Sequence, residues 1–171
     1  MENTSLIKSY KPRSSIGWIW FVLFAALVAG LGVYVMIVLG GMSGGNLVIL
    51  GIAAILAIGL LALALWFPSM RYELYSDKLV LRYGPVINYR IPFNEIRAIR
   101  TKNLSWTIMS SVRFPGIALF EVPYGGEGNI KMCSSAAVKN VLLIDTVNGK
   151  FGLTPAEEKD FIEALQARIK L

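Results

Sequence analysis

The sequence predicts an α+β protein in which a two-helix transmembrane hairpin precedes a barrel of about seven antiparallel strands, capped by one C-terminal helix. Three observations lead to this fold class. No Lys, Arg, Asp or Glu occurs between Arg13 and Arg71. Short segments of alternating apolar and polar residues follow Pro68, a pattern typical of half-buried strands. The last segment, from Thr154 onward, has the charge and apolar pattern of an amphipathic helix.

Two apolar runs, at residues 16–39 and 47–67, are each long enough to cross a bilayer, which takes roughly 20 residues. The uncharged segment at 40–46, GGMSGGN, allows only a tight reversal, so we expect an antiparallel hairpin. Small residues recur along both runs and would allow the helices to approach closely, although such residues are common in membrane helices generally. Neither run has an acidic or basic residue, which favours an anchor over a transport path.

Basic residues flank the outer ends of the hairpin and are absent from its loop. These residues are Lys8, Lys11 and Arg13 before the first run, and Arg71, Lys78 and Arg82 after the second. The positive-inside rule therefore places both termini in the cytoplasm, with a basic tail at 1–15 and a folded domain at 70–171. Three tryptophans, which prefer membrane interfaces, fall at the same ends: Trp18, Trp20 and Trp66. We expect a multi-pass protein of the cytoplasmic membrane.

Overall charge and rare residue types restrict the chemistry. The net charge of +6 comes from 17 basic and 11 acidic residues, a mild excess compared with nucleic-acid-binding domains, so we expect no nucleic-acid partner. The chain has no histidine and one cysteine, Cys133. This excludes an intrachain disulfide, a Ser-His or Cys-His nucleophile pair, and a zinc site built from histidines or cysteines. We expect no metal and no cofactor.

The segment after Pro68 has the pattern of short strands joined by turns. Alternation in RYELYSDKLVLRYG places a two-residue turn at Ser76 and Asp77. The remaining strand segments are VINYRI, IRAIRTK, IALFEV, IKMCSS, NVLLIDTV and KFGLT, with Asn148-Gly149 as the tightest turn. Residues 103–116 show no clean period, so we expect a long loop there.

The C-terminal helix has its own start signal. Thr154 fits the N-cap, Pro155 the first helical position, and Glu157 follows three residues after the cap. The apolar stripe of this helix, which we expect to cover an open end of the barrel, consists of Phe161, Ile162, Leu165 and Ile169.

Two stretches, YELYSDKLVLRYGPVINYRIPFNEIRAI and VLLIDTVNGKFGLTPAEEKDFIEAL, are similar to bacterial pleckstrin-homology-like (PH-like) domains found beside membrane hairpins. The resemblance extends from Met70 to about Ile169 and implies seven antiparallel strands followed by one helix. Eukaryotic members that bind phosphoinositides use basic residues around an extended first hairpin loop. Here that loop is only Ser76-Asp77, while Lys78 and Arg82 lie on a strand, so the resemblance does not imply phosphoinositide binding.

We interpret the protein as a non-catalytic, membrane-anchored binding or scaffold module that engages a protein or peptide partner at the inner membrane surface. Two alternatives remain open: an accessory subunit bound to a membrane complex through the hairpin, and a weak module for anionic lipids. Homo-oligomerisation also remains open. The acidic residues show no paired spacing typical of acid–base catalysis, and GGEG at 125–128 lacks the lysine and the helix of a phosphate loop.

The candidate binding residues lie in and before the irregular segment at 103–116. Four of them are basic and could meet an anionic surface, at roughly 1 kcal/mol each beside a membrane. Two are aromatic and unusual for a loop, which indicates an interaction surface. The alternative interpretation is a solvated basic face with aromatic residues packed over the barrel. The candidates are Arg97, Arg100, Lys102, Trp106, Arg113 and Phe114.

Overall fold

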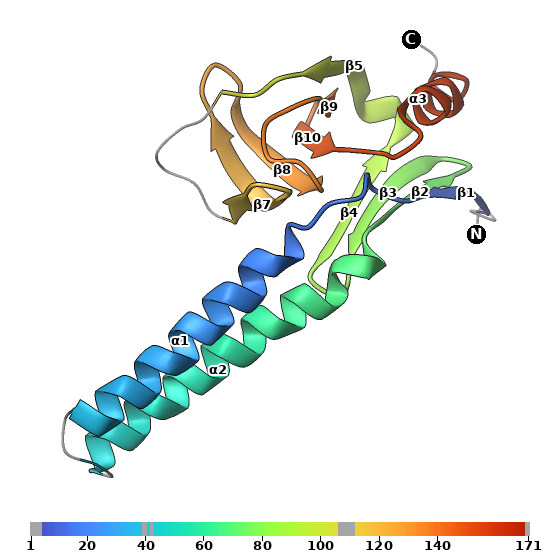
Figure 1. Cartoon of the computed structure of the whole chain (residues 1–171). Coiled ribbons are helices and arrows are strands. Elements are labelled where there is room, and N and C mark those ends of the chain that lie inside the picture. Colours follow the sequence, from blue (N-terminus) through green and yellow to red (C-terminus); the bar gives the residue numbers. More distant parts are fainter. Residues whose placement is uncertain (1–4, 39–40, 42, 106–111, 170–171) are drawn as a thin grey trace. The chain divides into compact units, whose positions relative to one another are not determined.

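The computed structural model describes residues 5–38, 41, 43–105 and 112–169 and divides the chain into two compact units (Figure 1). One unit is the helical segment Trp18–Pro68. The other combines Met1–Gly17 with Ser69–Leu171. The expected α+β class is confirmed, with two N-terminal helices, a β domain and a C-terminal helix.

The helical unit consists of α1 (Trp18–Val38) and α2 (Gly44–Trp66), followed by the short 3-10 helix η1 (Phe67–Ser69). The mean hydropathy is 2.7 for α1 and 3.0 for the segment Gly44–Ser69. Both helices are therefore long and apolar enough to cross a membrane, which supports the interpretation of the chain as a membrane protein.

Small side chains form the contact between α1 and α2. A Cβ atom added at Gly32 of α1 would lie 2.7 Å from the Cβ of Ala53 on α2, closer than real Cβ contacts. Ala25, Ala53 and Ala57 are also buried, whereas Gly30 faces open space. Close backbone approach at Gly32 therefore fixes how tightly the two helices pack.

The start of α2 is capped by polar groups of the connecting segment. The hydroxyl of Ser43 accepts a hydrogen bond from the amide of Asn46 at 3.3 Å. The side-chain amide of Asn46 donates to the carbonyl of Gly41 at 2.8 Å. These bonds satisfy backbone groups that a helix terminus and a turn leave without intrahelical partners.

The β domain contains two sheets. The first sheet is antiparallel, with the strand order β1-β2-β3-β4, and comprises β1 (Leu6–Tyr10), β2 (Arg71–Tyr75), β3 (Lys78–Tyr83) and β4 (Ile87–Pro92). The second has the order β5-β9-β10-β8-β7-β6. Its strands are β5 (Ile96–Lys102), β6 (Arg113–Phe114), β7 (Ile117–Tyr124), β8 (Gly128–Ser134), β9 (Val141–Thr146) and β10 (Gly149–Leu153). The 3-10 helix η2 (Phe93–Glu95) links the sheets, and α3 (Glu158–Gln166) follows β10.

The expected closed barrel of seven antiparallel strands needs correction. The described residues form ten strands in two separate sheets, and β10 pairs with β8 in parallel. After β8 the chain makes a short connection to β9, which runs in the opposite direction to β8. In the sheet, β9 does not pair with β8, and a space for one strand is left between them. The β9–β10 hairpin then places β10 in the gap between them, where its direction must match that of β8.

The N-terminal tail, for which the sequence pattern indicated no secondary structure, contributes strand β1 to the first sheet (Figure 1). Tyr10 is buried and its ring meets that of Phe161 on α3 edge to face, with 5.1 Å between centroids. Lys8 and Arg13 form ion pairs with α3, at 2.7 Å to Asp160 and 2.7 Å to Glu158. The tail is therefore part of the folded domain.

The predicted start of the last helix is wrong. The helix α3 begins at Glu158, and its N-cap position, Glu157, makes no side-chain capping bond. Thr154 is instead fully buried, and its hydroxyl accepts from the amide of Ser135 at 2.8 Å. The carbonyl of Thr154 accepts from the amide of Arg13 at 2.8 Å. Tertiary pairing with the tail therefore holds this segment extended, so the helix starts later.

One buried phenol connects the two sheets. The hydroxyl of Tyr72, on β2, donates to the carbonyl of Cys133, on β8, at 2.8 Å. The same oxygen accepts from the amide of Thr154, just after β10, at 3.2 Å. The ring of Tyr72 also meets Phe161 of α3 at 6.2 Å. Burial raises the pKa of the Tyr72 phenol, so it stays protonated and available as a donor.

Replacing Tyr72 by phenylalanine tests this connection. The Tyr72→Phe variant keeps the ring but removes the acceptor of the buried Thr154 amide, which costs roughly 1–3 kcal/mol of unfolding free energy. Thermal unfolding of the full chain in detergent should therefore shift to lower temperature. Tyr89→Phe is the matched control, because Tyr89 is half-buried and its ring contact with Phe151 needs no hydroxyl. Equal shifts in both variants would contradict the role of the Tyr72 hydroxyl.

The helix contact is tested by a pair of glycine substitutions. Gly32→Ala should weaken the hairpin because the added methyl group meets Ala53, whereas Gly30→Ala meets nothing within 4 Å. Helix propensity favours alanine at both positions by about 1 kcal/mol in water, so only the contact distinguishes them. Heating in detergent while helical circular dichroism is recorded should show earlier loss for Gly32→Ala alone. Identical curves would rule out the proposed close approach.

Candidate functional site

The six candidate binding residues fall into different environments. Trp106 lies outside the described residues. Arg97, Arg100 and Lys102 are on β5, and Arg113 and Phe114 form β6. Arg100 and Lys102 contact the same carboxylate, that of Glu127. Arg97 lines a hollow elsewhere on the domain, and Arg113 is buried.

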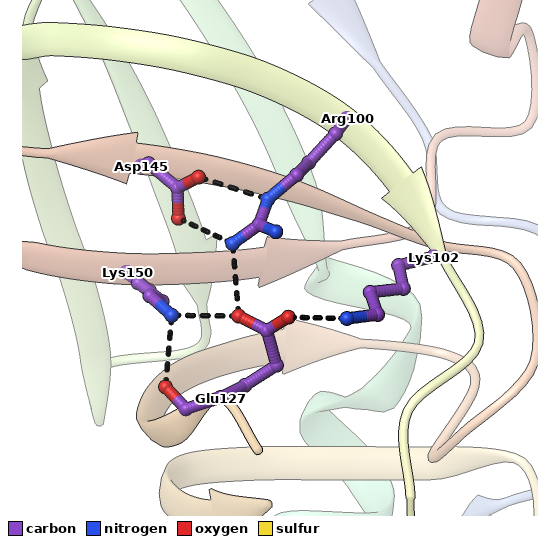
Figure 2. A network of polar contacts seen from close by, with 5 residues as sticks. All are labelled: Arg100, Lys102, Glu127, Asp145 and Lys150. Carbon is purple, nitrogen blue, oxygen red and sulfur yellow. Dashed lines mark hydrogen bonds and ion pairs between the residues drawn. The ribbon is translucent and has the colours of Figure 1, made fainter.

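Arg100 and Lys102 belong to an ion-pair network centred on Glu127, in the turn between β7 and β8 (Figure 2). The carboxylate of Glu127 accepts from Lys102 Nζ at 2.6 Å, from Lys150 Nζ at 2.6 Å and from Arg100 Nη2 at 2.8 Å. Arg100 also donates from Nε to Asp145 at 2.9 Å. Three strands and one turn are thereby tied together at this point.

The network lowers the pKa of Glu127 to about 2, chiefly through hydrogen bonds from Lys102 and Lys150 and through the nearby positive charge of Arg100. The Glu127 side chain is only 5% exposed, so its three cationic partners interact with it in a partly desolvated environment. Arg100 and Lys102 thus have a structural role that the sequence pattern did not reveal.

Arg113 has a buried position rather than a basic surface position. The residue is 3% exposed, and its guanidinium lies over the ring of Tyr124 with 4.9 Å to the centroid. Its Nη1 atom is 3.4 Å from the carbonyl of Pro123. Burial raises the pKa of Tyr124 to about 12, so Arg113 faces a neutral ring. Phe114, next to it, is half-buried and pairs with Ile117 across the β6–β7 hairpin.

Arg97 lines an open hollow of about 850 Å³ on the β domain. Three regions form this hollow: the β2–β3 turn, the segment from the end of β4 through η2 to the start of β5, and Arg168 just after α3. The apolar part of its lining consists of Pro92, Phe93 and Ile96. The polar part consists of Ser76, Asp77, Asn94, Arg97 and Arg168. The volume falls in the range typical of ligand sites, roughly 300–1,000 Å³.

Local backbone contacts hold the two turns of the hollow together. The amide of Phe93 donates to the carbonyl of Asp77 at 3.1 Å, which fixes η2 against the β2–β3 turn. Phe93 is 7% exposed and anchors η2 in the core. The amide of Val147 donates to the carbonyl of Glu95 at 3.1 Å and fixes the other end of η2. These bonds attach both ends of η2 to neighbouring turns at the rim of the hollow.

Arg168 was not among the residues that the sequence pattern singled out for binding, because it fits the end of the last helix as a basic residue. It is more than seventy positions after Arg97 in the chain, and only the packing of α3 brings both to the same hollow. Its guanidinium donates to the carbonyl of Ala164, one turn earlier. A basic residue beyond a helix C-terminus is ordinarily explained by the helix dipole, so no pattern distinguished it.

A second, smaller hollow of about 290 Å³ lies beside Gly116 and the segment Ser135–Lys139. Its lining is mainly apolar. The described residues contain no group of three or more Asp, Glu or Cys side chains that could hold a metal ion. Cys133 is buried, and burial raises the pKa of its thiol, so the thiolate form is disfavoured.

Comparison with known families identifies the β domain. The family model of the bacterial PH domain matches residues 70–169, more than half of the chain. The matched segment contains β2 to β10 and α3, while β1 lies outside it. The comparisons with curated proteins and with solved structures find no match.

The Glu127 network predicts a specific acid sensitivity. The pKa of Glu127 is lower in the folded chain, about 2, than the ordinary value of 4.5, so its ionised form adds stability above pH 4.5. That contribution is lost as the pH falls from about 4.5 toward 2. The stability difference between wild type and Glu127→Gln should therefore shrink over this window in denaturant titrations. Glu163→Gln, on an exposed position of α3, should show no such trend, and a constant Glu127→Gln difference would contradict the network.

Proposed function

The chain belongs to the bacterial PH domain family, and we propose that it is a non-catalytic, membrane-anchored binding or scaffold module. In this proposal the β domain engages a protein or peptide partner at the inner surface of the cytoplasmic membrane. The observation that carries the proposal is the family match at 70–169 directly after two helices able to cross a membrane. The hairpin holds the domain at the bilayer, and the domain supplies a rigid surface for recognition.

The orientation in the membrane rests on the distribution of charge. Basic residues flank both outer ends of the hairpin, and the connecting segment at 40–46 has none. The positive-inside rule supports cytoplasmic positions for the tail and the β domain. The tail and the domain form one compact unit, which supports positions on the same side of the membrane.

A binding role is also supported by the state of the reactive side chains. PH-like domains are generally non-catalytic. The Cys133 thiol is buried, and the carboxylates of Glu127 and Asp145 are ion-paired with strand residues. Catalytic acids, bases and nucleophiles instead need to meet a substrate. Fold likeness alone does not give a function, so the proposal depends on the surface of this domain.

The alternative, an accessory subunit attached through the hairpin, is favoured by the outward glycines of the helices. A methyl group added at Gly30, Gly51 or Gly59 would have nothing within 4 Å, which leaves room for another helix to approach. A weak lipid-binding module receives less support, since Arg100 and Lys102 are ion-paired and Arg113 is buried.

Photo-cross-linking in native membranes separates these functions. A photoreactive amino acid at Asn94, on the rim of the hollow, should capture a discrete protein, while one at exposed Asn88 on β4 is the matched control. A second form of the chain would carry two unrelated apolar helices in place of α1 and α2.

Retention of the captured protein by the helix-swapped chain would support a β domain that binds its partner directly. Loss of capture on swapping the helices would favour the accessory-subunit alternative. If Asn94, Asn88 and other exposed positions of the β domain captured no protein, the proposed binding function would be contradicted.

A further inference from the structure

The hollow beside η2 has an excess of positive charge, since two arginines and one carboxylate line it. Arg97 is exposed, and Arg168 is half-buried. Among the described residues neither arginine forms an ion pair, and the guanidinium of Arg168 donates only to a backbone carbonyl. The carboxylate of Asp77 at the same rim is already 3.4 Å from the ammonium of Lys78. An anionic group that enters the hollow would therefore meet two arginines for which the described residues show no ion-pair partner.

This arrangement differs from that of five basic residues that are neutralised within the domain. Arg100, Lys102 and Lys150 share Glu127, while Lys8 and Arg13 pair with α3. Arginine binds planar carboxylates through two parallel hydrogen bonds, which makes it suited to acidic side chains. Two arginines that reach one hollow from β5 and from beyond α3 could each hold one such group.

The size and the mixed lining of the hollow indicate a ligand larger than a single anion. Its volume of about 850 Å³ far exceeds that of one carboxylate or phosphate group. Phe93, Pro92 and Ile96 offer apolar surface, and Asp77 can accept a hydrogen bond from a backbone amide. Charged, apolar and hydrogen-bonding contacts are together what a polypeptide segment requires.

We propose that the hollow binds a short acidic peptide segment of a partner protein, with acidic side chains on Arg97 and Arg168 and an apolar side chain against Pro92 and Phe93. This inference rests on the proposed binding function and adds the chemical class of the partner segment, which is an acidic peptide. A phosphorylated lipid headgroup is the less favoured ligand, because it offers no apolar side chain to pack against Pro92, Phe93 and Ile96.

The test is selection of random short peptides displayed on phage against the full chain in lipid nanodiscs. Selected sequences should be enriched in Asp and Glu flanking an apolar residue. A fluorescent copy of one selected peptide should lose affinity by about tenfold or more for Arg97→Glu/Arg168→Glu, since two charge-assisted contacts are reversed. Arg90→Glu/Lys159→Glu makes the same change in net charge at exposed positions outside the hollow and should bind as wild type does.

A change in the peptide, with the protein left unmodified, excludes misfolding of a protein variant as the cause of lost binding. Replacing the acidic residues of the peptide by Gln and Asn should abolish binding to the unmodified protein. Selection of no peptides, enrichment of non-acidic peptides, or equal losses in both double variants would overturn the inference. So would displacement of the peptide by glycerol phosphate, which would assign the hollow to a lipid headgroup. None of these results decides whether the domain binds a protein partner at all. The cross-linking experiment tests that binding function separately, because it uses no acidic probe.

Discussion

The hydrogen bonds of the Tyr72 phenol are the interaction on which the β domain depends most directly. One oxygen atom joins β2 of the first sheet, β8 of the second sheet and the chain just before α3. The ring of the same residue packs against Phe161, so α3 is positioned from the same point. Arg168, which lines the hollow, follows α3 in the chain. A buried hydroxyl with both a donor and an acceptor role thus orders elements that are distant in the sequence.

Electrostatics divide the basic residues into those held in ion pairs within the domain and those for which the described residues show no ion pair. Glu127 collects three cations in a nearly buried position, which ties β5 and β10 to the β7–β8 turn. The tail is held to α3 by two further ion pairs, so the first strand and the last helix stabilise each other. Exposed ion pairs of this kind contribute little individually, typically below about 1 kcal/mol. Here they act together with the pairing of β1 and β2 and with the ring contact between Tyr10 and Phe161. The proposed acidic peptide would instead meet the two arginines that line the hollow, Arg97 and Arg168.

Sequence patterns were most informative where the determinant is local. Hydropathy located both helices of the hairpin, and alternation located the strands from β2 to β5 and the turn at Ser76-Asp77. The start of α3 was predicted wrongly because Thr154-Pro155 fits a helix N-terminus equally well in isolation. In the folded chain the Thr154 hydroxyl and carbonyl bind Ser135 and Arg13 instead. Long-range hydrogen bonds outweighed a local capping preference of about 1 kcal/mol.

By itself, the sequence determined the division into an apolar hairpin and a β domain with a final amphipathic helix, since these depend on periodicity and on the absence of charge over a long stretch. The tertiary structure alone decided that β10 lies parallel to β8, that the tail forms β1, and which basic residues form ion pairs within the domain. Arg97 and Arg100 are three positions apart and similar in the sequence. One lines a hollow and the other pairs with Glu127 and Asp145, because strand pairing determines which side chains of distant segments meet.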